Sequence, residues 1–157
     1  MIFVTAGSLH FPFDRLLRAV DALPGDEELI VQSLAGCPLS GRAQHVRDLP
    51  YEKLVDDVCR ARVVVCHAGV GSVLTSLAHN KRPVVVPRLQ RYGEAVDDHQ
   101  LSFGRRLSEA GLVTLVEDPV GLADVVASPA PEWHPNGHAN RLALDVRATL
   151  EQLVYSR

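Results

Sequence analysis

The sequence contains little that would hold a protein together by covalent or metal cross-links. Its three cysteines, Cys37, Cys59 and Cys66, are an odd number, and no CxxC pair occurs. A disulfide scaffold or a structural zinc site is therefore not expected, and a reducing compartment is the natural setting.

Long apolar runs and a strong charge imbalance are also lacking. No run approaches the ~18 residues needed to cross a bilayer, and the start of the chain lacks the pattern of a signal peptide. The 16 Lys and Arg residues against 19 Asp and Glu give a net charge of −3, which offers no general attraction for nucleic acid. We therefore expect a cytoplasmic protein that binds no nucleic acid.

Strand and helix signals alternate along the chain. Short apolar runs predict strands at residues 1–6, 28–34, 62–66, 83–86 and 112–116. The runs 62–66 and 83–86 are almost wholly apolar, as in parallel strands that are buried on both faces. Since helical spacing recurs between them, we predict an α/β fold, a Rossmann-like parallel sheet with helices on both faces and right-handed crossovers.

The length of 157 residues corresponds to one compact domain, which we place at 1–127. Residues 128–138 are rich in Pro and Gly and are interpreted as a linker. Residues 139–157 carry an apolar stripe at helical spacing, so we expect a C-terminal helix that packs on the domain or on a partner.

Ligands of such sheets bind beyond the carboxyl ends of the strands. Three loops, 7–13, 67–71 and 88–96, leave those ends and carry the unusual residues of this sequence. The fold and the composition of the loops therefore point to the same edge of the sheet.

The glycine-rich loop 67–71 joins a buried strand to a helix. Gly69 and Gly71 allow close approach of a ligand, and Ser72 is predicted as the helix N-cap. Free N–H groups and the helix dipole would form an anion site suited to a diphosphate. The GxGxxG pattern is incomplete, because Leu74 replaces its third glycine, and no GxxxxGK[ST] motif occurs, which excludes the ATPase loop. A tight turn that needs glycine for geometry alone is the alternative.

The other two loops allow both functional and structural interpretations. The loop 88–96 and the following helix start gather acceptors and amides that suit the hydroxyls of a sugar, with helix capping by Asp97 or Asp98 as the alternative. In the loop 7–13, Gly7, Ser8 and His10 are candidates for ligand contact. His67 has no second metal-binding side chain at helical or CxxC spacing, so no metal is expected.

Four segments in combination resemble a known family. HAGVGS (67–72), NKRPVVVPR (80–88) and YGEAVDDHQ (92–100) resemble the C-terminal, donor-binding half of family 28 glycosyltransferases. The opening VTAGSLHFPFDRLLRAVD (4–21) is similar to a subgroup in which this half is a separate small subunit, in bacterial exopolysaccharide and eukaryotic lipid-linked oligosaccharide synthesis. The resemblance covers about residues 2–125.

The resemblance implies half of a GT-B enzyme that binds a UDP-sugar without a metal or other cofactor. The diphosphate would meet four residues, with His67 close to the phosphates: Gly69, Val70, Gly71 and Ser72. Pro87 and Arg88 would end the strand beside the nucleotide. The donor sugar would face Glu94, Asp98, His99 and Gln100.

Two residues depart from the family pattern. Thr75 stands where relatives often carry a glutamate that binds the ribose hydroxyls, so ribose recognition would be weaker than usual or would come from elsewhere. Asn80 stands where glycine is common, and asparagine tolerates the left-handed conformation expected there.

The expected function is that of a donor-binding subunit of an inverting glycosyltransferase, which transfers a hexose-type sugar to a polyprenyl-diphosphate-linked acceptor. The acceptor base would lie on a membrane-anchored partner, which would hold this chain at the cytoplasmic face of the membrane and without which it would be inactive or weakly active. Two alternatives remain open: a stand-alone nucleotide-sugar hydrolase or epimerase with His10 or His67 as base, and a non-catalytic nucleotide-binding module. The identity of the sugar also remains open, although Arg88 or Arg91 would suit a sugar carboxylate.

Overall fold

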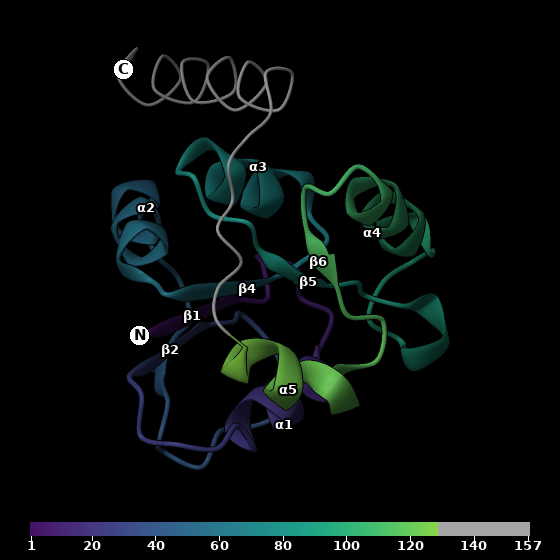
Figure 1. The fold of residues 1–157 in the computed structure, drawn as a ribbon. Coiled ribbons are helices and arrows are strands. Elements are labelled where there is room, and N and C mark those ends of the chain that lie inside the picture. The colour runs from purple at the N-terminus through teal and green to yellow at the C-terminus, as the bar shows by residue number, and fades with distance from the viewer. Residues whose placement is uncertain (129–157) are drawn as a thin grey trace.

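The computed structural model describes residues 1–128, which form a six-stranded sheet with helices on both faces (Figure 1). The strands are β1 (Ile2–Thr5), β2 (Leu29–Gln32), β3 (Gln44–Val46), β4 (Val63–His67), β5 (Val84–Val86) and β6 (Thr114–Leu115). The helices are α1 (Asp14–Asp21), α2 (Tyr51–Arg60), α3 (Val70–Ala78), α4 (His99–Glu109) and α5 (Leu122–Ala127), with 3-10 turns η1 (Gln90–Tyr92) and η2 (Pro119–Gly121). The predicted C-terminal helix 139–157 and all but the first residue of the predicted linker 128–138 lie outside the described residues.

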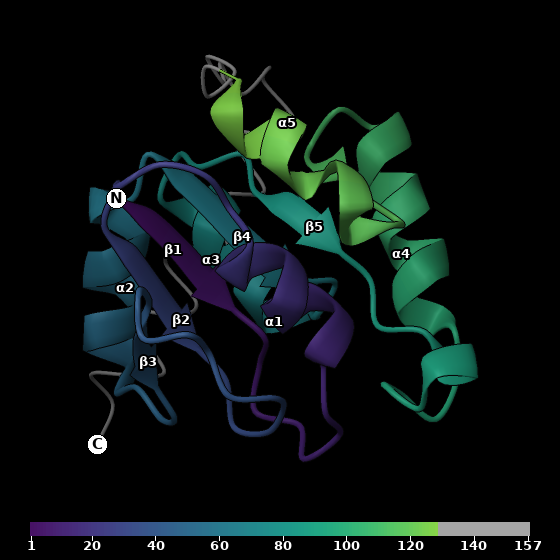
Figure 2. The same ribbon diagram turned by 90° about the horizontal axis from the view of Figure 1, so that it is seen from below.

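The strand order is β3-β2-β1-β4-β5-β6, and each neighbouring pair is parallel. Helices α1 and α5 cover one face, and α2, α3 and α4 cover the other (Figures 1 and 2). The predicted α/β sheet with helices on both faces is confirmed. Because the chain crosses from β3 at one side to β4 on the other side of β1, the topological switch lies between β1 and β4.

The core follows from the apolar strands. Residues of β1, β2 and β4 are buried on both faces of the sheet, and Val4, Val31 and Val65 are fully buried. On one face, α1 and α5 pack their apolar residues against these strands; on the other face, α2 and α3 each contribute a smaller cluster. The strands and helices therefore form the apolar core without the loops at the carboxyl edge. Those loops can carry polar residues.

Both edge strands are short. Strand β3 has three residues, two of them exposed, and β6 has only two. Among the helices described for residues 1–128, none combines the length and the apolar character that a membrane span requires.

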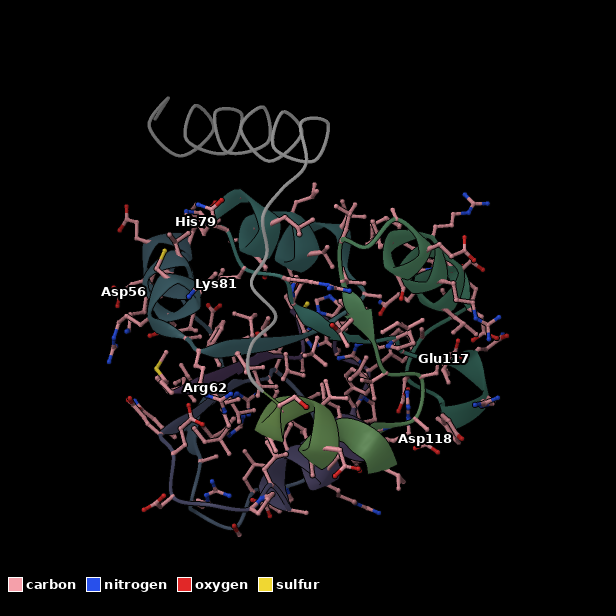
Figure 3. The ribbon with its side chains drawn as sticks, viewed as in Figure 1. Asp56, Arg62, His79, Lys81, Glu117 and Asp118 are labelled. Carbon is pink, nitrogen blue, oxygen red and sulfur yellow. The ribbon has the colours of Figure 1, made fainter. Side chains whose placement is uncertain are left out.

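An ion pair fastens the amino-terminal edge of the sheet. Arg62, which precedes β4, donates to Glu27 at 3.0 and 2.6 Å and to the carbonyl of Val126 in α5 at 3.1 Å. Figure 3 shows Arg62 on the side of the molecule away from Glu117 and Asp118. The Arg62 guanidinium lowers the pKa of Glu27 to about 2. The ionised form of Glu27 therefore stabilises the folded state.

We expect Glu27→Gln to lower the free energy of unfolding at pH 7 by about 1–2 kcal/mol, a value reduced for the partial exposure of the pair. Because the pKa of Glu27 is depressed in the folded state, its contribution is complete above pH 4.5 and disappears as the pH falls toward about 2. Urea unfolding of both proteins across this range measures the difference. A gap that stays constant with pH would contradict the assignment.

Candidate functional site

The strand register brings the predicted loops to one edge. Thr5 of β1 lies opposite Gln32 of β2 and Cys66 of β4, and His67 lies opposite Val86 of β5. The loops that follow these residues therefore leave the sheet side by side, as the sequence predicts.

The imidazole of His67 lies between two glycines from different loops. A Cβ atom added to Gly7 would lie 2.5 Å from Cε1 of the ring, and one added to Gly69 would lie 2.1 Å from Nε2. Gly7 also adopts a positive φ of 82°. Both positions need glycine because the backbone approaches the ring too closely for any side chain.

His67 is buried in a neutral form. Its side chain belongs to a residue only 9% exposed, and Nδ1 has no hydrogen-bond partner among the described residues. Burial, with a smaller effect of the positive charge of Arg88, lowers the pKa of His67 to about 4. At neutral pH the ring therefore presents an uncharged donor and acceptor to the loops.

Helix α3 starts at Val70, with Gly69 in the N-cap position and no side chain capping the helix. The predicted N-cap, Ser72, is therefore wrong by three residues. Ser72 already lies in the first turn, where its carbonyl accepts the hydroxyl of Ser76 at 2.9 Å. Since Gly69 takes an extended backbone against His67, the helix begins directly after it. The first N–H groups of α3 have no helical acceptor and are directed toward the sheet edge.

A cleft of about 400 Å³ lies beside these loops. Six of the predicted site residues line it: Gly7, Ser8, His67, Gly71, Ser72 and Thr75. Five residues that the sequence reasoning missed complete the lining: Thr5, Gln32, Leu49, Tyr51 and Leu54. Gly69 and the exposed Val70 adjoin it at the start of α3.

The missed residues come from β1, β2, the start of α2 and the loop that precedes it. A glutamine that ends an apolar strand was the available signal for Gln32, because its carboxyl end reaches the predicted edge. Gln32 accepts the hydroxyl of Thr5 at 2.7 Å and donates to the carbonyl of Gly7 at 3.4 Å. Leu49, Tyr51 and Leu54 reach the cleft only because α2 packs beside α3, which sequence spacing does not show.

The second loop is held by buried polar side chains. Arg88, Glu94 and Gln100 are 1%, 2% and 3% exposed. Arg15 of α1 donates to the Glu94 carboxylate at 3.1 and 2.9 Å and to the carbonyl of Pro87 at 2.8 Å. Gln100 Oε1 accepts the backbone N–H of Arg88 at 3.1 Å.

The polar groups of these three side chains are thus directed into the protein rather than into the cleft. The guanidinium of Arg88 is surrounded by backbone carbonyls, so it does not reach a sugar carboxylate. Burial lowers the pKa of Arg88 to about 10, which leaves it charged at neutral pH.

Asp98 and His99, by contrast, are exposed at the start of α4. Asp98 occupies the N-cap position without a capping bond and accepts the N–H of Gln90 at 2.8 Å. Asp97 accepts the N–H of His99 at 3.0 Å and contacts its ring. His10, the candidate base of the first loop, is exposed as well.

Two single residues complete the description of the site. Asn80 has a φ of 58°, which confirms the left-handed conformation expected there. Burial raises the pKa of the Cys66 thiol to about 12, so this cysteine behaves as an apolar residue. Across residues 1–128, no group of three His, Cys, Asp or Glu side chains is placed to hold a metal ion.

We expect Gly69→Ala to lower the free energy of unfolding by about 1–3 kcal/mol, because the new methyl group overlaps the imidazole of His67. Gly71→Ala is the matched control, since its Cβ meets no atom within 4 Å and alanine favours the helix. The double variant Gly69→Ala with His67→Ala should lose less free energy of unfolding than the sum of the losses in the two single variants. Additive losses in urea unfolding would contradict the packing.

We also expect the His67 ring to remain neutral from pH 8 to about pH 5 and to titrate near pH 4. NMR of the ring Cε1–H signal measures this midpoint, with His67→Gln to assign the signal. A midpoint of 6 or above for His67 would contradict its burial as a neutral group.

Comparison with known proteins places the chain in a family. The family model described as "Glycosyltransferase family 28 C-terminal domain" matches residues 1–130. Two relatives named UDP-N-acetylglucosamine--N-acetylmuramyl-(pentapeptide) pyrophosphoryl-undecaprenol N-acetylglucosamine transferase, from Ralstonia nicotianae and Cupriavidus necator, are 31% and 32% identical. The matches cover 81% and 71% of this chain but only 39% and 34% of the relatives, so the chain spans well under half of their length.

Two solved structures share the fold at low sequence identity. The calicheamicin glycosyltransferase CalG4 matches with a TM-score of 0.60 and 15% identity, covering 96% of this chain and 38% of CalG4. The glycosyltransferase SnogD from Streptomyces nogalater matches with a TM-score of 0.52 and 19% identity, covering 96% of this chain and 39% of SnogD. The chain belongs to glycosyltransferase family 28, and its residues 1–130 are the C-terminal domain of that family.

Proposed function

We propose that this chain is the donor-binding subunit of an inverting glycosyltransferase that moves a hexose-type sugar from a UDP-sugar to a polyprenyl-diphosphate-linked acceptor. The observation that carries the proposal is the cleft at the carboxyl ends of β1 and β4, where two glycine loops close on His67 in a family 28 domain. This cleft lies at the switch point where open parallel sheets bind nucleotides.

The diphosphate is proposed to bind at the start of α3. The helix presents N–H groups without acceptors, and the positive end of its dipole favours an anion. Gly69, Val70, Gly71 and Ser72 form this turn, and Gly7 and Ser8 approach from the first loop. The neutral His67 would contribute a hydrogen bond rather than a charge, and the dipole would offset the charge of the leaving UDP without a metal.

The nucleoside is proposed to lie along α3 toward α2. Thr75 lies one turn beyond Gly71 and lines the cleft, so its hydroxyl is placed for the ribose. Leu49 and Leu54 give the far end of the cleft an apolar wall suited to a base. A threonine in this position offers one hydroxyl, so ribose binding would rest more on the walls of the cleft.

The sugar is proposed to face the second loop. Of the residues predicted to face the sugar, Asp98 and His99 are exposed, whereas Glu94 and Gln100 are buried and would shape the loop from within, as would Pro87 and Arg88. Direct contact with sugar hydroxyls would thus come from Asp98, His99 and the loop backbone.

The acceptor and its base are proposed to lie on a membrane-anchored partner subunit. Both relatives are named as transferases to an undecaprenol-linked acceptor, and this chain matches less than half of each. Five apolar side chains are exposed in the carboxyl-edge loops and at the start of α3: Leu9, Phe11, Val70, Tyr92 and Val96. An exposed apolar surface of this kind is suited to contact with a second domain that would close the cleft. The chain would then work at the cytoplasmic membrane face and be weakly active or inactive alone.

Calorimetry with uridine, UDP, UDP-glucose, UDP-glucuronate and UDP-GlcNAc, in EDTA, tests the donor site. We expect UDP and at least one UDP-sugar to bind tenfold or more tightly than uridine, because the diphosphate meets the α3 dipole. Gly69→Ala should abolish this binding, whereas Gly121→Ala, whose Cβ meets no atom within 4 Å, should not.

Absence of binding across the panel, or binding that Gly69→Ala leaves unchanged, would refute the proposed site. Sugar transfer that appears only after addition of membranes containing the partner supports the two-subunit arrangement. Turnover by the purified chain alone would instead favour a stand-alone hydrolase or epimerase.

A further inference from the structure

Arg88, at the end of β5, is a charged side chain in an almost fully buried position, 1% exposed. Its guanidinium donates to backbone carbonyls from two loops and the end of β1. Nη2 donates to the carbonyl of Ala6 at 2.8 Å. Nη1 donates to the carbonyls of Phe11 at 2.9 Å, Pro12 at 3.4 Å and Glu94 at 3.1 Å.

These acceptors belong to the two loops that form the proposed donor site. Ala6, Phe11 and Pro12 flank or lie in the loop after β1, which carries Gly7 and Ser8. Glu94 lies in the loop after β5, which leads to Asp98 and His99. One planar group therefore joins the proposed diphosphate wall to the proposed sugar wall.

We propose that Arg88 is a positioning residue for the donor: it fixes the loop 7–13 against the loop 88–98, so that the diphosphate and the sugar are bound in one geometry. This inference rests on the proposed function. It assigns to Arg88 an action through the two loops, without contact to the substrate.

The side chain is itself held in place from several directions. The ring of Phe13 lies under the guanidinium at 4.5 Å from its centroid. Gln100 fixes the backbone N–H of Arg88, and the Glu94 carboxylate accepts the N–H of Leu89 at 3.0 Å. Arg15 in turn holds Glu94 and the carbonyl of Pro87. Arg88 and the groups that hold it therefore have few alternative arrangements.

The geometry requires arginine rather than another long side chain. The guanidinium spreads its donors over a rigid plane and reaches carbonyls on both sides, whereas the lysine ammonium is a single point. Burial of a charge in this position is costly unless its hydrogen bonds are made.

The test compares Arg88→Lys with the native full-length chain. Calorimetry measures affinity for UDP, for the UDP-sugar that the native chain binds best, and for uridine. We expect Arg88→Lys to weaken UDP-sugar binding tenfold or more and uridine binding by less than about threefold, because only the longer ligand spans both loops. Phe13→Leu, which leaves Arg88 in place, should give the same pattern to a smaller extent and serves if Arg88→Lys does not fold.

Arg62→Lys is the matched control. Arg62 donates to a backbone carbonyl as Arg88 does and also pairs with Glu27, but it lies before β4, at the amino-terminal edge of the sheet. Its substitution should lower the free energy of unfolding without changing the affinity for the UDP-sugar relative to the affinity for uridine. The positioning role would be overturned if Arg88→Lys lost affinity for both ligands equally, or if its affinity for the UDP-sugar were unchanged.

Hydrogen exchange provides a readout that needs no ligand. In Arg88→Lys, amides of residues 7–13 and 89–98 should exchange at least tenfold faster, while those of β1, β4 and β5 keep their protection. Unchanged exchange in both loops would overturn the inference. If the native chain binds no nucleotide but Arg88→Lys still speeds exchange in both loops, the proposed function is refuted. The role of Arg88 in holding the two loops together would then still stand.

Discussion

A single buried guanidinium imposes the main constraint at the carboxyl edge of this sheet. Because Arg88 stays charged at neutral pH and is shielded from water, the surrounding backbone has to supply acceptors. The two loops do so by turning carbonyls inward, and that orientation leaves their outer surface for glycines, hydroxyls and exposed acidic and imidazole groups. The buried charge thus determines how both loops are arranged at the carboxyl edge of the sheet.

The same charge reaches the centre of the cleft. It acts together with burial to keep His67 neutral, so the ring fits between two glycine backbones without a counter-ion. The lining described for the cleft contains no Lys or Arg side chain. Attraction for an anion in this half of the site would therefore come from peptide dipoles at fixed positions, which do not need to reorganise as charge develops.

The sequence was sufficient for the architecture because the relevant signals are local. The apolar runs 62–66 and 83–86, for example, correspond to β4 and β5 with boundaries shifted by about one residue. Gly7, His67 and Gly71 were also identified correctly as neighbours, since parallel strands bring their carboxyl ends together.

Orientation of side chains could not be predicted in the same way. Glu94 and Gln100 have the composition of a sugar-binding surface, but their partners, Arg15 and the N–H groups of Leu89 and Arg88, are set by tertiary contacts. Likewise, nothing in the local pattern distinguishes Ser72 from Gly69 as the N-cap, because the deciding contact is the ring of His67.

The short edge strands have a consequence for assembly. A sheet that ends in the three residues of β3 and the two residues of β6 offers very few free backbone groups for pairing with another polypeptide. Lateral extension into a continuous intermolecular sheet is thereby disfavoured, which protects the chain against fibre-like stacking. Any stable association of the described domain must then rely on side chains of its helices and loops.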